Sequence, residues 1–147
     1  MRISTKGRYG LRAMLDLALH SGGNQVALLN IAQRQNISVN YLEQVFSLLR
    51  KAGLVKSVKG AQGGYTLAED PARITVGTIL RALEGDLKVI DEDSESNDES
   101  DESLQPCIRK NVWEKINAGV AAAVDSVTLG DLMEEYRGSN EAPMFYI

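Results

Sequence analysis

Cysteine and histidine each occur once in the 147 residues, as Cys107 and His20. A single cysteine excludes an internal disulfide framework and a multi-cysteine metal site within one chain, and a single histidine excludes a histidine-rich metal centre. The chain also has no run of eighteen apolar residues, and its start, MRISTKGRYGLRAM, lacks the apolar block and cleavage site of a secretory signal. We therefore expect a soluble, cytoplasmic protein with no membrane segment.

Acidic residues are scarce in the first 66 residues, which hold nine Lys or Arg but only Asp16 and Glu43, a net charge of +7. The remainder carries a net charge of −11, so the overall value of −4 conceals two halves of opposite sign. This asymmetry favours an N-terminal half that faces a polyanion and a C-terminal half with another task. A solvated basic face with no ligand is the alternative.

Three amphipathic helices are predicted in the basic half from apolar residues that recur at 3-4 spacing. The first follows Thr5, the second spans residues 28–35, and the third runs from an N-cap at Ser38 to a stop at Gly53. The second and third form a helix-turn-helix pattern in which the third has a polar outward face. Two-helix corners without DNA share this pattern, so it needs support from the rest of the chain.

Basic side chains gather around the start of the first predicted helix, at Arg2, Lys6, Arg8 and Arg12. Backbone N–H groups are free at a helix start, so these groups and the side chains together could reach a phosphate strand. An ordinary charged helix start is the alternative.

A β-hairpin is predicted directly after the third helix. Residues 54–59 alternate apolar and polar, and residues 65–68 are their return partner. The tip between them, GAQGG, is flanked by Lys56 and Lys59 and has little side-chain bulk, so its backbone could approach a phosphate or enter the minor groove. Nucleotide binding is not expected, because the loop lacks the spacing of a phosphate-binding motif.

The chain then divides into four segments. We predict a winged helix-turn-helix DNA-binding domain at 1–85, an acidic flexible loop at 86–105, dimerisation helices at 106–137 and a C-terminal tail at 138–147. The fold class is mainly α with a small β-hairpin wing and a long C-terminal dimerisation helix. An apolar stripe too long for so small a core predicts a helix that pairs with a second copy of itself; its members are Ile108, Val112, Trp113, Ile116, Val120 and Val124.

Several segments together resemble one family, the bacterial winged-helix transcription regulators that include IscR, NsrR and CymR. They are MRISTKGRYGLRAMLDLAL, NISVNYLEQVFSLLRKAGLVKSVKGAQGGYTL, ITVGTILRALEG and the later TLGDL. The resemblance is closest to the CymR-type branch. It implies a regulator without catalytic activity that binds double-stranded DNA as a homodimer, with the second helix of the helix-turn-helix in the major groove.

The resemblance also assigns DNA contacts by position. The base edges or nearby phosphates would be met by Ser38, Asn40, Tyr41, Glu43 and Gln44. The DNA backbone would be bound by Arg2, Lys6, Arg50, Lys51, Lys56 and Lys59, and the wing tip would contribute Gln62 and Gly63. Glu43 is informative, because an acid on such a surface is costly unless it accepts a hydrogen bond from a base such as cytosine.

Iron–sulfur members of this family hold their cluster with three cysteines before the long helix. Here only Cys107 is present, and one thiolate cannot hold a cluster, so no metal or other cofactor is expected. Cys107 is interpreted as a structural or incidental thiol; a redox thiol is the alternative. The corresponding alternative function is a redox, iron–sulfur or metal-responsive sensor of the same family.

The C-terminal tail ends in Phe145, Tyr146 and Ile147. The CymR-type resemblance implies a repressor of cysteine and sulfur metabolism genes that works with the cysteine synthase O-acetylserine thiol-lyase. The usual partner of that enzyme inserts a C-terminal isoleucine into its active site, so we predict that this tail binds the same pocket. Packing of the tail on its own dimer is the alternative.

Overall fold

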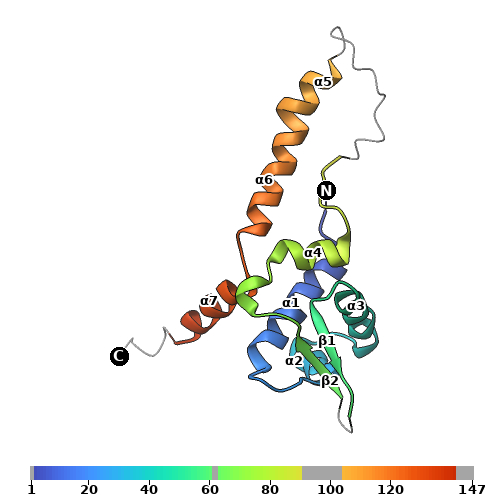
Figure 1. Cartoon of the computed structure of the whole chain (residues 1–147), viewed down its shortest axis with the longest axis vertical. Coiled ribbons are helices and arrows are strands. Elements are labelled where there is room, and N and C mark those ends of the chain that lie inside the picture. Colours follow the sequence, from blue (N-terminus) through green and yellow to red (C-terminus); the bar gives the residue numbers. More distant parts are fainter. Residues whose placement is uncertain (1, 61–62, 91–103, 142–147) are drawn as a thin grey trace.

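The computed structural model of the chain describes residues 2–60, 63–90 and 104–141. It is mainly helical with one two-stranded antiparallel sheet, which confirms the predicted fold class (Figure 1). None of the helices in these ranges combines the length and apolar character needed to span a bilayer. The elements are α1 (Thr5–His20), α2 (Leu28–Gln35), α3 (Val39–Lys51), β1 (Val55–Val58), β2 (Gly64–Leu67), η1 (Pro71–Arg73), α4 (Val76–Glu84), α5 (Gln105–Ile108), η3 (Arg109–Trp113), α6 (Glu114–Asp125) and α7 (Leu129–Glu141).

Local capping explains where α3 and α4 begin. The Ser38 hydroxyl accepts a hydrogen bond from the Tyr41 amide at 3.4 Å, and the Thr75 hydroxyl accepts one from the Thr78 amide at 3.0 Å. Asn36 ends α2 in the left-handed region, with φ of 55°, a conformation that Asn tolerates better than most residues. The predicted N-cap at Ser38 is therefore confirmed, and the turn that joins α2 to α3 is tight.

The core lies where α1, α2, α3 and α4 meet, and its largest fully buried side chains include Met14, Leu17, Ile31, Phe46 and Ile79. Burying a side chain of this size contributes roughly 1.5–3 kcal/mol to the free energy of unfolding. The apolar face of α3 is buried, so its opposite face is left to solvent; the buried residues are Leu42, Val45, Phe46 and Leu49.

The two strands form the wing, in which Val55 pairs with Leu67 and Val58 with Gly64. The wing is attached to the loop after α1 by an antiparallel bridge, since the Val26 and Tyr65 backbones exchange hydrogen bonds of 2.9 Å. Gly64 has φ of 136°, and a Cβ there would lie 2.8 Å from the Val26 carbonyl oxygen. Only glycine therefore fits at this close approach.

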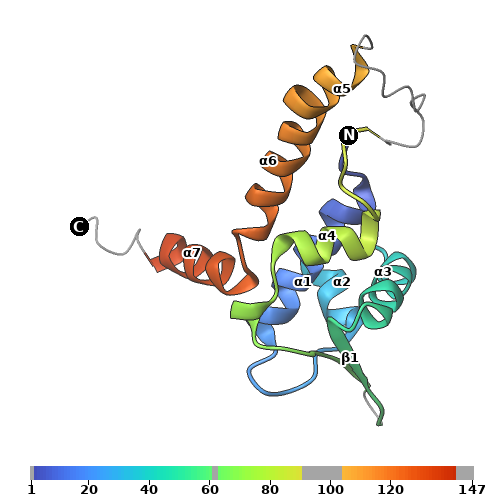
Figure 2. The same cartoon turned by 45° about the horizontal axis from the view of Figure 1, so that its top comes forward.

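The helical segment from 105 to 125 projects away from this body, as both views show (Figures 1 and 2). It was predicted as one regular helix, but the turn at Arg109–Trp113 is wound as a π-helix. No residue of α5, η3 or α6 is buried, and Ile108, Val112 and Ile116 are 42%, 39% and 42% exposed. Such a row of apolar side chains in solvent is characteristic of an interaction surface.

The chain returns to the body at the start of α7. The Val76 amide donates to the Val127 carbonyl at 2.8 Å, and the Leu129 amide donates to the Ile74 carbonyl at 2.9 Å. Leu129 is fully buried and belongs to the same core as α1 and α3. The core of the winged domain, predicted to come from residues 1–85, thus also includes Leu129, which belongs to the segment predicted as dimerisation helices.

A charged pair also ties the end of α6 to α4. The Arg81 guanidinium donates two hydrogen bonds to the Asp125 carboxylate, at 2.6 and 2.9 Å. The hydrogen bond from Arg81 holds the pKa of Asp125 below its usual value. Both side chains are about two-fifths exposed, 40% and 43%, so the pair defines geometry more than it adds stability.

Three predicted features lie outside the described residues: the acidic run at 91–103, Gln62 at the wing tip, and the tail residues Phe145, Tyr146 and Ile147.

Candidate DNA-binding surface

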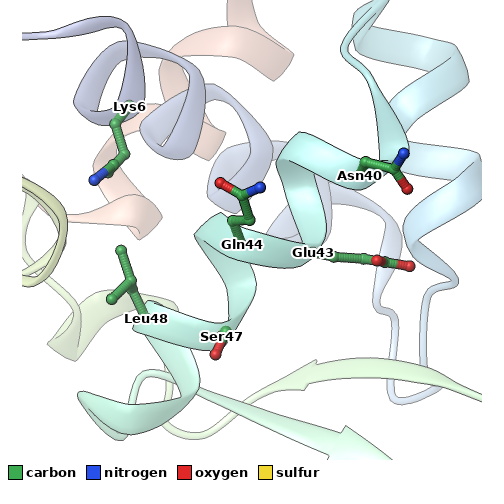
Figure 3. A pocket seen from close by; sticks show the side chains of 6 residues that line it. All are labelled: Lys6, Asn40, Glu43, Gln44, Ser47 and Leu48. Atoms are coloured by element: carbon green, nitrogen blue, oxygen red, sulfur yellow. The ribbon is translucent and has the colours of Figure 1, made fainter.

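The outward face of α3 carries the side chains predicted to read bases. Asn40, Glu43 and Gln44 are exposed, and with Lys6 of α1 they line an open hollow of about 720 Å³. In the close view, Gln44 lies between Lys6 on one side and Asn40 and Glu43 on the other (Figure 3). The structure thus brings an amide pair, a carboxylate and an ammonium group onto one surface, which can offer both donors and acceptors to base edges.

Ser38 and Tyr41 differ from these three in having structural partners. The Ser38 hydroxyl oxygen caps α3, so it accepts a hydrogen bond from the protein itself. The Tyr41 ring is half-buried and meets the Tyr9 ring edge-on, with centroids 6.1 Å apart and planes at 77°. Their hydroxyl hydrogens remain able to donate, but these residues also hold the start of α3 in place.

The six basic residues predicted to meet the DNA backbone are all exposed, and none forms an ion pair with a described carboxylate. They come from α1 and its leader, the C-terminal end of α3, and β1 with the turn after it. Their charges are therefore available to phosphates. They are Arg2, Lys6, Arg50, Lys51, Lys56 and Lys59.

The prediction about free backbone amides at the start of α1 is wrong for two of them. The Glu84 carboxylate, from the end of α4, accepts hydrogen bonds from the Ser4 amide at 3.1 Å, the Gly7 amide at 2.9 Å and the Ser4 hydroxyl. A carboxylate is favoured at a helix N-terminus for the same reason as a phosphate. The chain therefore satisfies these two amides internally, and the exposed side chains of Arg2 and Lys6 remain available to DNA.

The wing tip contains three glycines with positive φ: Gly60 at 154°, Gly63 at 53° and Gly64 at 136°. The Gly63 amide donates to the Gly60 carbonyl at 3.2 Å, so these two ends of the tip lie close together. Lys56 and Lys59 flank it on the β1 side and are exposed. This arrangement presents backbone and two ammonium groups with few bulky side chains between them.

A buried ion pair joins α1 to α2 and was missed at the sequence level. The Asp16 side chain is fully buried, and the Arg34 guanidinium donates to both of its oxygens, at 2.7–3.2 Å. The Gln35 amide donates to the same carboxylate at 2.8 Å. Burial alone would raise the pKa of Asp16, but the hydrogen bonds from Arg34 and Gln35 outweigh it and hold the pKa below its usual value. Arg34, one of the nine basic residues of the first half, is thus committed to the fold.

Cys107 is exposed at the start of the projecting helix. The Asn111 side-chain amide donates to the Cys107 carbonyl at 2.8 Å and lies 3.8 Å from its sulfur. Within the part of the chain that the structure describes, no three His, Cys, Asp or Glu side chains gather where they could hold a metal ion.

The comparisons with known proteins agree with this geometry. Residues 3–135 match the model of the Rrf2 family, described as an iron-dependent transcriptional regulator. The chain is 46% identical to the HTH-type transcriptional regulator CymR of Bacillus subtilis (strain 168) over 147 residues, which is the whole of both chains. It is 42% identical to the HTH-type transcriptional regulator IscR of Vibrio cholerae over 134 residues, 90% of this chain and 75% of that protein.

A solved structure shows the same fold. The structure of CymR, the global cysteine regulator of B. subtilis, superimposes with a TM-score of 0.77 at 44% identity, covering 92% of this chain and 98% of that one. Agreement at this level extends over the winged module and the C-terminal helices. The chain therefore belongs to the Rrf2 family of winged-helix, DNA-binding transcriptional regulators.

Proposed function

We propose that this protein is a repressor of cysteine and sulfur metabolism genes that binds a pseudo-palindromic operator as a homodimer. The observation that carries the proposal is the exposed face of α3 between unpaired basic side chains of α1 and the wing. The choice of regulon rests on the similarity to CymR, whose structure is described as that of the global cysteine regulator of B. subtilis.

The proposed DNA contacts divide into two groups. Asn40, Glu43 and Gln44 meet base edges in the major groove, where an amide can pair with adenine and a carboxylate can accept from the cytosine amino group. Ser38 and Tyr41 contact nearby phosphates or bases at the start of α3. The exposed Lys and Arg side chains, with the wing tip at Gln62 and Gly63, bind the backbone and set the register of the dimer on the duplex.

Dimerisation is proposed through the projecting helical segment. Residues 105–125 span roughly 30 Å at the usual helical rise. Over that length the apolar side chains of the stripe stay partly exposed. The same apolar side chains of a second copy would cover them. Two recognition helices related by a two-fold axis would match a pseudo-palindromic site, which is why such an operator is proposed. The stripe consists of Ile108, Val112, Trp113, Ile116, Val120 and Val124.

Replacing Lys59 by Ala tests the phosphate contacts. The slope of log K against log salt should become shallower by about one unit, because one fewer counterion is released on binding. Base preference should stay the same. The measurement is a fluorescence-anisotropy titration on operator DNA at several salt concentrations.

Lys88→Ala is the matched control, because Lys88 is also an exposed lysine but lies after α4, outside the proposed surface. Its slope should equal that of the unaltered protein. A change of base preference in Lys59→Ala at constant slope would show that the wing has been assigned wrongly.

The tail is proposed to bind a cysteine synthase, O-acetylserine thiol-lyase. Deleting Tyr146 and Ile147 should abolish binding of that enzyme in isothermal titration calorimetry, because the terminal carboxylate and apolar side chain are the proposed anchors. Operator affinity of the isolated regulator should not change. Binding of the enzyme by the truncated chain as tightly as by the full chain would contradict the tail assignment.

The IscR relatives and the family description favour a second candidate, an iron–sulfur sensor. The residues present do not fit such a cluster, because its usual ligands are several thiolates and this chain has only Cys107. A visible absorption band with bound iron and sulfide in anaerobically purified protein would favour the sensor. A colourless protein that binds operator DNA with full affinity would favour the repressor without cofactor.

A further inference from the structure

A pocket of about 360 Å³ lies between α1, α2 and α7, and none of the proposed DNA contacts lines it. Its walls include Arg12, Leu15 and Leu19 of α1, Arg34 of α2 and Tyr136 of α7. The volume is at the lower end of the range for small-molecule sites. The pocket therefore could hold a ligand of modest size, and the question is which chemistry its walls would select.

The first selective feature is a positive charge that the pocket does not balance. The charge of Arg34 is neutralised by Asp16. Arg12 donates to the Gln35 carbonyl at 2.8 Å, and its guanidinium carbon lies 4.9 Å from the centre of the Tyr9 ring. Neither partner carries negative charge, and no described carboxylate forms an ion pair with Arg12.

Arg12 is also held in a fixed orientation by these two partners. A guanidinium has five N–H donors, so a single hydrogen bond to a carbonyl leaves donors for a ligand. The pocket thus favours a ligand with one negative charge, which would neutralise the positive charge of Arg12.

The second selective feature is apolar surface beside Arg12. Leu15 and Leu19 are half-buried in the wall formed by α1. Tyr136, which is 51% exposed, provides an aromatic ring from α7. A ligand that fills this space therefore needs an apolar body attached to its charged group.

We propose that this pocket binds a small organic carboxylate whose charged group pairs with Arg12 and whose apolar body lies against Leu15, Leu19 and Tyr136. A planar carboxylate matches the planar donor pair of a guanidinium, and its single charge balances the single excess charge. A phosphate dianion would leave the pocket with excess negative charge. Arg34 and Gln35 directly precede the turn into α3, so the ligand would lie next to the helix proposed to read DNA.

Benzoate and its neutral analogue benzamide test the proposal on the full chain without DNA. Titration with benzoate should give saturable shifts in NMR spectra at the Leu15 and Leu19 methyl groups. Benzamide has nearly the same shape, so charge is the main difference, and it should give no saturable shift. Arg12→Gln should weaken benzoate binding by about tenfold or more, the usual contribution of a charge-assisted hydrogen bond.

Arg8→Gln is the matched control, because Arg8 is an exposed arginine on the same helix outside the pocket. Its affinity for benzoate should equal that of the unaltered chain. If Arg12→Gln does not fold, Tyr136→Ala replaces it, since the exposed Tyr136 contributes little to the core and its loss should still weaken benzoate binding.

Four results would overturn the proposal. They are the absence of saturable shifts with benzoate, equal affinity for benzoate and benzamide, unchanged affinity in the folded pocket variant, and inorganic phosphate binding at the same residues as tightly as benzoate.

Discussion

Ile116→Glu is expected to convert the proposed dimer into a monomer and to weaken operator binding by about 100-fold or more, since linked binding modules gain roughly 10²–10⁴ in avidity. Ile116 lies near the middle of the exposed stripe, at 42% exposure. Two copies of a glutamate facing each other across a two-fold axis would place like charges in an apolar contact, which is strongly unfavourable. The mass of the protein in solution, from sedimentation or light scattering, and its operator affinity are the measurements.

The fold itself should survive this change, because no residue of α6 is buried in the single chain. Ala118→Glu is the matched control: Ala118 is also exposed on α6, but two residues away and therefore on another face. It should remain dimeric. A dimeric Ile116→Glu protein with normal operator affinity would show that the subunits associate through some other surface.

Asp16→Asn is expected to lower the free energy of unfolding by about 1.5–3 kcal/mol, the range for hydrogen bonds to charged groups. The Asp16 carboxylate accepts all of its side-chain hydrogen bonds from α2, so the change weakens the contact between the first two helices. Arg34 would lose its counter-charge, but its side chain is 35% exposed and can turn to water, which limits the loss. Urea unfolding followed by circular dichroism measures the difference.

Asp16 should also make the free energy of unfolding depend on pH. The pKa of Asp16 is lower in the folded state than in the unfolded state, so the carboxylate adds stability above its unfolded pKa of about 3.9. That contribution should be lost as pH falls from there through the folded pKa. Asp16→Asn should lack this part of the acid dependence.

Asp125→Asn provides the comparison, because Asp125 is also paired with an arginine but is exposed. It should leave the unfolding midpoint nearly unchanged, as exposed ion pairs are screened by water. Equal stability of the Asp16→Asn protein and the unaltered protein would contradict a stabilising role for the buried pair.

Local signals in the sequence predicted the DNA-binding module well. Ser38 precedes an apolar periodic run and caps its helix as expected, and Thr75 does the same for α4. Gly53 and Gly85 follow helix ends with positive φ, as the capping rules predict. These features depend on residues within a few positions of one another, so they can be recognised without knowledge of the fold.

Contacts between distant residues could not be predicted in the same way. The Glu84 carboxylate caps α1 from 80 residues away, and nothing near Ser4 indicates which acid will do so. The burial of Asp16 was only weakly indicated by the sequence, through its place beside the buried Leu17 in the first apolar run. Nothing in the sequence indicated that Arg34 would be its partner, since an arginine on a short polar helix is usually exposed. The π turn at Arg109–Trp113 likewise has no distinctive local pattern.

The burial of Leu129 has a consequence for the order in which the chain folds. Leu129 occupies the core formed by α1, α2 and α3, yet the backbone that pairs with it is that of Ile74. Contacts among the first helices are local and form fast, whereas this contact must close a long stretch of chain. A nascent chain in which only α1 to α4 have left the ribosome therefore lacks a core side chain. The DNA-binding module reaches its final packing only when the C-terminal helix has been synthesised and has docked.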